Sequence, residues 1–177
     1  MKNIILSIRE VEPGLVTACH KLSEKLGYKL EGLVIIPVDF INNPKAVNDT
    51  SGFFKSLIID FDNPSDIKQK LEPYLDRILT VNCRFETAIQ QYIKTIPFLP
   101  ESVSAPTVES LQSCTEKSLM RDKLRDFDKS LIPKYTIIES FNISKQNLSE
   151  IVSEMVFPMV VKPSGLYSSL LVTKCID

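Results

Sequence analysis

Short apolar runs rich in β-branched residues alternate with helical patterns along the first half of the chain. The runs predicted to be strands span residues 3–8, 30–39, 56–61 and 78–83. Apolar residues at helical spacing predict helices over residues 13–26, 64–76 and 86–96. This alternation favours a doubly wound parallel sheet, because parallel strands need long crossover connections. We therefore expect an α/β, Rossmann-like fold, with any ligand at the carboxyl ends of the strands.

Glycine is scarce and carries no cofactor fingerprint. Neither G-x-G-x-x-G nor G-x-x-x-x-G-K-[ST] occurs among the five glycines, so the Rossmann-like half lacks the usual nucleotide signal. Gly27 is predicted to end the first helix as a C′ glycine. Ser65 is a possible N-cap of the second helix.

Charge and hydropathy exclude two classes of partner. The chain has 177 residues, with 21 basic and 22 acidic side chains and a net charge of −1. That balance gives no electrostatic reason to expect nucleic acid or an anionic membrane surface. No apolar run reaches the roughly 18 residues of a membrane span, and the apolar start is too short for a signal peptide. We expect a cytoplasmic protein.

The four cysteines are widely separated and form no C-x-x-C pair. They stand at positions 19, 83, 114 and 175, which predicts reduced, mostly buried thiols in a reducing compartment. A single histidine, His20, leaves little material for a zinc site.

Residues 97–106 are rich in proline and serine and predict a linker. The expected domains are therefore 1–106 and 107–177. The second should contain a helical stretch over 108–130 that breaks near Thr115, with Thr115 capping the second helix. A strand (134–139), a helix (144–155) and two strands (157–162 and 166–175) should follow, the last two as antiparallel neighbours.

Two lysines and a carboxylate stand where a ligand could bind. Lys117 is expected at position N2 of a helix, where exposed amides and an ammonium suit an anion; a solvated surface lysine is the alternative. Lys162 ends an apolar strand, and it either snorkels to water or meets a buried anion. Glu86 follows the fourth strand, where it either contacts a ligand or favours a helix start.

The serine-rich turn after Lys162 is a candidate phosphate cradle. It contains Ser164, Gly165 and Ser168, whose amides and hydroxyls could face phosphate oxygens. An ordinary hairpin turn is the alternative.

Three stretches, taken in order, resemble the front part of the ATP-grasp superfamily. The first is the Rossmann-like half that ends in Arg-Phe-Glu-Thr-Ala at 84–88. The second runs from Thr107 through Thr-Glu-Lys-Ser-Leu-Met-Arg at 115–121 to Ile-Pro-Lys-Tyr at 132–135, with Glu116 where aspartate is usual. The third, Phe-Pro-Met-Val-Val-Lys-Pro at 157–163, is similar to the family's strand that ends in Lys-Pro and is the most specific of the three.

The resemblance implies a Rossmann-like domain followed by a small α+β part of an incomplete ATP-grasp domain. It implies that Lys117 and Lys162 hold the phosphates and adenine of ATP, under a flap at 164–171. Gly165 and Ser168 fit that flap, whereas a later glycine usual in the loop is absent. The Mg²⁺ ligands of the family would lie beyond residue 177, so we expect the N-terminal portion of a longer enzyme.

The activity implied is ligation. A small-molecule carboxylate would be activated as an acylphosphate and attacked by an amine or similar nucleophile. The alternatives are a fragment of a biotin-carboxylase-type carboxylase, a non-catalytic nucleotide- or ligand-binding module, and an unrelated flavodoxin-like domain. An exposed sheet edge would also permit a homodimer.

Overall fold

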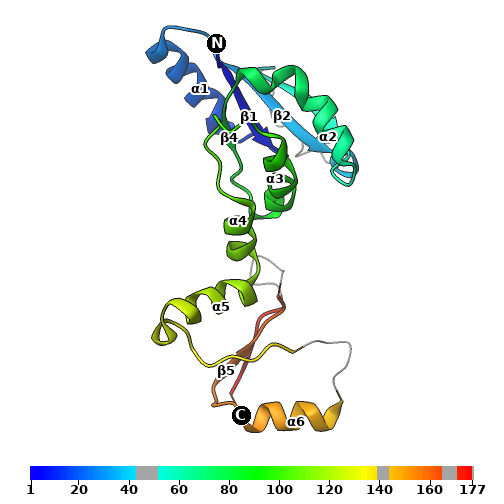
Figure 1. Cartoon of the computed structure of the whole chain (residues 1–177), viewed down its shortest axis with the longest axis vertical. Helices are drawn as coiled ribbons and strands as arrows, with labels where there is room; N and C mark the ends of the chain where they lie inside the picture. Colours follow the sequence, from blue (N-terminus) through cyan, green and yellow to red (C-terminus); the bar gives the residue numbers. More distant parts are fainter. Residues whose placement is uncertain (43–51, 139–143, 165–170, 177) are drawn as a thin grey trace. The chain divides into compact units, whose positions relative to one another are not determined.

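The computed structural model describes residues 1–42, 52–138, 144–164 and 171–176. Its contacts divide the chain into two units, Met1–Leu111 (unit 1) and Gln112–Asp177 (unit 2). The sequence placed the boundary at the end of the 97–106 linker. Each unit is described by itself below (Figure 1).

Unit 1 is built on a four-stranded parallel sheet. Its strands are β1 (Ile4–Ile8), β2 (Glu31–Pro37), β3 (Phe54–Ile59) and β4 (Ile78–Asn82). They lie in the order β3-β2-β1-β4, and every neighbouring pair is parallel. The predicted α/β, Rossmann-like arrangement is therefore confirmed for this unit.

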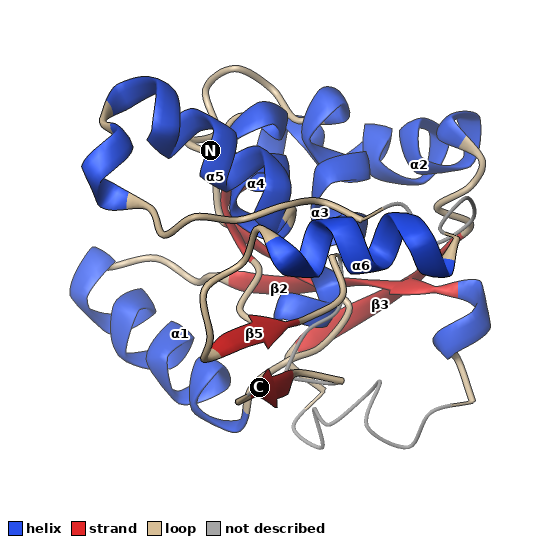
Figure 2. Ribbon diagram, turned by 90° about the horizontal axis from the view of Figure 1, so that it is seen from below, coloured by secondary structure: helices blue, strands red, loops and turns tan. Residues whose placement is uncertain are grey.

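Helices cover both faces of this sheet. They are α1 (Pro13–Leu26), α2 (Pro64–Leu71) and α3 (Ile89–Thr95). Figure 2 shows α1 on one side of the sheet, with α2 and α3 on the other. Short 3₁₀ turns adjoin the longer elements, at Val38–Phe40, Glu72–Arg77, Glu86–Ala88 and Ile96–Phe98.

The alternation of side chains along β1 gives each face its own core. Leu6 and Ile8 pack with Ile67 of α2 in one cluster, whereas Ile5 packs with Cys19 of α1 in the other. Successive residues of a strand point to opposite faces, so a strand of a doubly covered sheet needs apolar residues at nearly every position, and in β1 only Ser7 is polar.

Of the two helix-end predictions in unit 1, one is confirmed and one is wrong. Gly27 ends α1 in the left-handed region, at φ 73°, as predicted. The second helix, however, is capped by Asn63 and not by Ser65. The Asn63 side chain accepts hydrogen bonds from the backbone N–H groups of Ser65 and Asp66. Asparagine one residue before Pro64 satisfies two N–H groups that the first turn leaves unpaired.

Unit 2 contains short elements. They are α5 (Lys117–Phe127), a 3₁₀ turn (Lys129–Leu131), α6 (Lys145–Ser153), β5 (Met159–Val161) and β6 (Thr173–Cys175). A further helix, α4 (Val108–Thr115), crosses the division between the units. β5 and β6 pair antiparallel, with Val160 opposite Lys174, so the predicted antiparallel arrangement of the last strands is confirmed.

Two strand predictions in unit 2 are corrected. Residues 134–138 of the predicted 134–139 strand form no regular structure. Of the predicted 166–175 strand, residues 166–170 lie outside the described residues and only Thr173–Cys175 is extended and paired. A strand forms only where a partner strand accepts its hydrogen bonds, and sequence periodicity does not identify that partner.

Burial differs sharply between the units. The buried apolar side chains all lie in unit 1, whereas no described residue of unit 2 is fully buried. All four cysteines are free, as expected. Cys19 is buried, Cys83 and Cys175 are half-buried and Cys114 is exposed, so the expectation of mostly buried thiols is wrong for Cys114. Across the described ranges, no helix is both long and apolar enough to cross a bilayer.

Candidate functional site

The connections of the sheet diverge beside β1. From β1 the chain forms β2 and then β3 on one side, and it returns to the other side of β1 to form β4. In open α/β sheets, ligands bind at such a divergence, outside the carboxyl ends of the strands. Residues 9–12 follow β1 and residues 83–87 follow β4, and we call them the switch-point segments.

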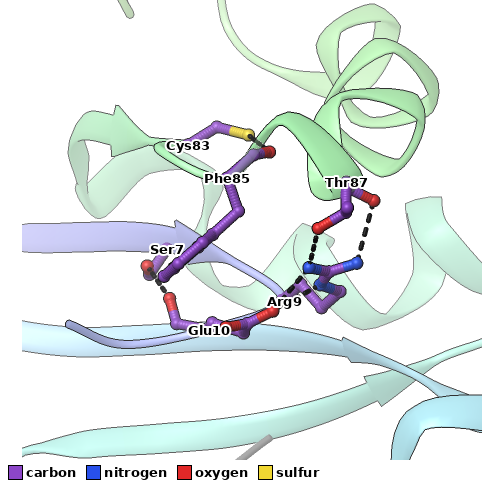
Figure 3. Close-up of polar contacts among 6 residues, drawn as sticks. All are labelled: Ser7, Arg9, Glu10, Cys83, Phe85 and Thr87. Atoms are coloured by element: carbon purple, nitrogen blue, oxygen red, sulfur yellow. Dashed lines mark hydrogen bonds and ion pairs between the residues drawn. The ribbon is translucent and has the colours of Figure 1, made fainter. Parts of the chain in front are cut away.

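Arg9 ties the two switch-point segments together (Figure 3). Its Nη1 donates to the backbone oxygen of Thr87 at 2.8 Å, and its Nη2 donates to the hydroxyl of the same residue. Its Nε and Nη2 donate to Glu10 Oε1 at 2.9 and 2.5 Å. The guanidinium also lies 4.9 Å from the centre of the Phe40 ring. Because these contacts engage the whole guanidinium, Arg9 positions the segments.

The backbone of Arg9 is left-handed, at φ 68°. A residue other than glycine in the left-handed region costs on the order of 1–3 kcal/mol of conformational free energy. The surrounding contacts must offset that cost. The Arg9 N–H donates to the Ile35 oxygen at 2.8 Å, and the contacts to Thr87 hold the side chain. The result is a sharp turn directly after β1, in which the Glu10 N–H donates back to the Ile8 oxygen at 2.9 Å.

Two further polar side chains in or beside the switch-point segments, those of Ser7 and Cys83, are not reactive. Ser7 Oγ donates to the Glu10 backbone oxygen at 2.6 Å and accepts from the Asn82 amide at 3.4 Å. Cys83 Sγ lies 4.0 Å from the Phe85 oxygen (Figure 3). Burial raises the pKa of the Cys83 thiol to about 11, and the nearby charge of Arg9 lowers it only in part. A thiol with this pKa is protonated at neutral pH and is a poor nucleophile.

Glu12 and Arg84 form a second ion pair between the same segments. Arg84 Nη1 donates to Glu12 Oε2. The Glu12 side chain is only 18% exposed, whereas that of Arg84 is 71% exposed. The other carboxylate oxygen of Glu12, Oε1, is buried, and no described residue donates a hydrogen bond to it. Glu12 is the N-cap residue of α1, but its side chain makes no capping bond.

Sequence reasoning did not single out Arg9, Glu12 or Arg84. A usable signal was present, because charged residues follow the first predicted strand directly and Arg84 follows the fourth. What was missing was the strand order, which makes the ends of β1 and β4 neighbours.

Glu86, predicted to contact a substrate, lies in the second switch-point segment. It opens the 3₁₀ turn Glu86–Ala88 and is exposed. Thr87, its neighbour, is held by Arg9. The structure therefore brings Glu86 to the carboxyl end of the sheet, where a ligand can reach its carboxylate.

Lys117 is the first residue of α5, not the second helical residue as predicted. The N-cap is Glu116, and its side chain makes no capping bond. Thr115 is not the cap, because its hydroxyl donates back to the Gln112 oxygen of α4 at 3.1 Å. Lys117 is half-buried. An ammonium here opposes the helix dipole, and an anion bound between the two would favour both.

Lys162 follows β5 directly and is exposed. Its strand neighbour Val160 is 58% exposed, so the apolar face expected to surround this lysine is open. Ser164 is exposed two residues further on, whereas Gly165 and Ser168 lie outside the described residues. Each lysine is of a type that binds phosphate, and Lys117 stands beside the amides at the start of α5.

An open hollow of about 570 Å³ lies in unit 2, and neither Lys117 nor Lys162 is among its lining residues. It is lined by Asp122, Arg125, Lys129, Lys134, Tyr135 and apolar residues of 132–137. The Tyr135 hydroxyl donates to Asp122 at 2.5 Å, and this bond raises the pKa of Tyr135. The described residues include no group of three or more His, Cys, Asp or Glu that could hold a metal.

Comparison with known proteins assigns no family. No family model matches the chain, and no curated protein shows significant similarity to it.

Proposed function

We propose that this chain is the N-terminal part of an ATP-dependent ligase of the ATP-grasp type, which joins a small-molecule carboxylate to an amine. The observation that carries the proposal is Lys162 at the end of β5, in an antiparallel pair that follows a parallel α/β unit. This order matches the order of the three motifs on which the resemblance depends.

Two further observations support the nucleotide site. Lys117 stands at the first residue of α5, where helix amides and an ammonium together suit an anion. Unit 2 exposes apolar side chains such as Val160 and Leu171, 58% and 72% exposed, as the first part of a larger nucleotide-binding domain would. Lys117, Lys162 and Ser164 would hold the phosphates, and Mg²⁺ would neutralise their charge when bound.

The substrate site in this proposal is the switch point of unit 1. The ends of β1 and β4 carry paired charges and the exposed carboxylate of Glu86. A small carboxylate or amine bound there would meet preformed ion pairs, which orient a ligand with little reorganisation. We place the protein in the cytoplasm, which keeps four free thiols reduced.

Calorimetry with ATP and Mg²⁺ on the full-length gene product tests the nucleotide site. We expect saturable binding that Lys162→Ala weakens by about tenfold or more, a loss of about 1.4 kcal/mol. Lys174→Ala is the matched control, because Lys174 is an exposed lysine on the paired strand, opposite Val160. Wild-type protein that ignores ATP, or equal affinities in the two variants, would refute the proposal.

A homodimer through the sheet edge is a separate part of the proposal. β3 and β4 are the outer strands of the sheet in unit 1, and unpaired edge groups can pair with a second copy. Light scattering over a range of concentrations should show a mass that rises towards twice that of the monomer. A constant monomer mass would rule this out.

A further inference from the structure

The ion pair between Glu12 and Arg84 is only half satisfied. One oxygen of Glu12 accepts from Arg84, but the other is buried without a donor among the described residues. Burying an acceptor without a hydrogen-bond partner costs the full free energy of removing it from water. This desolvation penalty is larger when the group is charged. A carboxylate in this position is therefore prepared to accept a hydrogen bond from a donor that this part of the chain does not supply.

Arg84 has the complementary property. Its side chain is 71% exposed, and only Nη1 contacts Glu12. A guanidinium carries several further N–H donors in a planar fork that matches a carboxylate. The pair thus presents a carboxylate that is 18% exposed and incompletely hydrogen-bonded beside a guanidinium with several unused donors.

The charges around the pair discriminate between ligands. Arg9 is neutralised by Glu10, and Arg84 by Glu12, which leaves the exposed carboxylate of Glu86. The two switch-point segments thus carry three carboxylates and two guanidinium groups, an excess of negative charge that disfavours a phosphate. A ligand with one positive and one negative group leaves the balance of charge unchanged.

The frame that holds the pair is preorganised. Arg9 bonds to Thr87 across the switch point and fixes the segment after β1 against the segment after β4. Glu12 belongs to the first of these segments and Arg84 to the second. A site whose supporting contacts are already made loses less free energy in ordering when it binds.

We propose that the Glu12–Arg84 pair binds a zwitterionic small molecule of the amino acid class. The ligand ammonium donates to Glu12, and the ligand carboxylate accepts from Arg84. This inference rests on the proposed function, because it names the substrate class of the switch-point site. It requires no covalent step and no nucleotide, so it can be tested without ATP.

The test is binding of the common amino acids, each alone, to the full chain without nucleotide. A thermal-shift screen identifies the amino acids that stabilise the protein, and calorimetry then measures their affinity. The N-acetyl derivative of each ligand lacks the ammonium, and the corresponding alkyl amine lacks the carboxylate. We expect both to bind at least about tenfold more weakly than the parent amino acid.

Two variants and one control assign the effect to the pair. Glu12→Gln keeps the shape but removes the charge, and it should weaken the amino acid by about tenfold or more. Arg84→Gln changes a mostly exposed side chain, so it should fold and show a similar loss. Glu24→Gln, at an exposed carboxylate on α1, should bind like the wild type. Far-UV circular dichroism of each variant checks that it is folded.

The possible results separate this inference from the nucleotide site. The zwitterion site is refuted if no amino acid stabilises the protein. It is also refuted if folded Glu12→Gln, Arg84→Gln and Glu24→Gln bind the amino acid with equal affinity. If amino acids bind as expected while the full-length protein ignores ATP, the ligase proposal fails and the amino acid site stands. If ATP binds and amino acids do not, the reverse holds.

Discussion

The two units have similar local spacings of apolar residues in their sequences, but they bury their side chains to very different extents. In unit 1, Leu6 and Ile35 are completely buried in a sheet covered on both faces. In unit 2, residues at comparable helical and strand spacings remain open, with Leu124 and Val160 at 36% and 58% exposure. Periodicity therefore predicts the elements of unit 1 and only some of those in unit 2, whereas burial depends on which elements meet.

The difference follows from the number of partners that each strand has. β1 has a strand on each side, and helices cover both faces of the sheet to which it belongs (Figure 2). Among the described residues, β5 pairs only with β6, over three residues. An isolated pair of strands is marginally stable in water, whereas several strands packed against helices are stable. Unit 1 should therefore dominate the stability of the chain.

The largest test compares a leucine from each unit. Leu6→Ala removes a fully buried side chain of unit 1 and should lower the free energy of unfolding by about 2–5 kcal/mol. Leu124→Ala, in α5, should lower it by less than about 1 kcal/mol, because that side chain already meets water. Urea unfolding followed by circular dichroism measures both. Equal losses would contradict the contrast between the units.

Cysteine labelling distinguishes the units by reactivity. Cys83 has a pKa of about 11, because burial disfavours the thiolate, so at pH 8 it should react about a hundredfold more slowly than a free thiol of ordinary pKa. Cys114 is exposed and should be modified first. Mass spectrometry after timed alkylation gives the order. Early labelling of Cys83 in folded protein would show that unit 1 opens readily.

A smaller effect is expected where two strands of unit 1 approach closely. A Cβ at Gly32 of β2 would lie 2.6 Å from the ring of Phe54 on β3. Gly32→Ala should therefore destabilise the protein by about 1–3 kcal/mol through overpacking. Gly14→Ala is the control, because no atom lies within 4 Å of the added methyl group apart from its chain neighbours and the backbone of its own helix. That change, inside α1, should be neutral or stabilising, and a loss equal to that of Gly32→Ala would contradict the clash.

The smallest effect concerns pH and the surface of unit 1. Hydrogen bonds from Lys70 and from the Asp60 amide lower the pKa of Asp66. Because the folded pKa lies below the unfolded value near 3.9, this stabilisation is present above about pH 4 and is lost as the pH falls through the folded value. The Asp66 side chain is 19% and that of Lys70 38% exposed, so water still screens the pair, and we expect it to contribute about 0.2–1 kcal/mol.

Thermal unfolding between pH 3 and pH 7 measures that contribution. In Asp66→Asn, the melting temperature should fall less steeply than in the wild type at the acid end of this pH range. At higher pH, the plot of melting temperature against pH should run parallel to that of the wild type. Asp126→Asn is the control in unit 2, since that carboxylate is 75% exposed and 3.6 Å from Arg125. Identical curves for wild type and Asp66→Asn would remove Asp66 from the acid response.

The elements of unit 1 were predictable because their signals are local. The apolar run at 4–8 and the glycine at position 27 specify a strand and a helix end without knowledge of the rest of the chain. Helix starts were less certain. At Asn63 and Glu116, neighbouring polar residues compete for the cap, and the choice depends on backbone geometry that the sequence leaves open.

The candidate site residues also differ in whether the sequence or only the structure identified them. Lys117, Lys162 and Glu86 were found from sequence, because each stands at the end of a predicted element. The Arg9–Thr87 bond and the Glu12–Arg84 pair join residues more than seventy positions apart. Their contact exists only because β4 returns beside β1.

The sequence by itself determined the class of the fold, the free state of the cysteines and the residues able to carry charge near strand ends. Those properties depend on residue type and on spacings within a helix or strand. Only the tertiary structure decided the strand order, the left-handed turn at Arg9 and the unpaired oxygen of Glu12. Each of these depends on segments distant in the chain, whose meeting is set by the packing of the whole sheet.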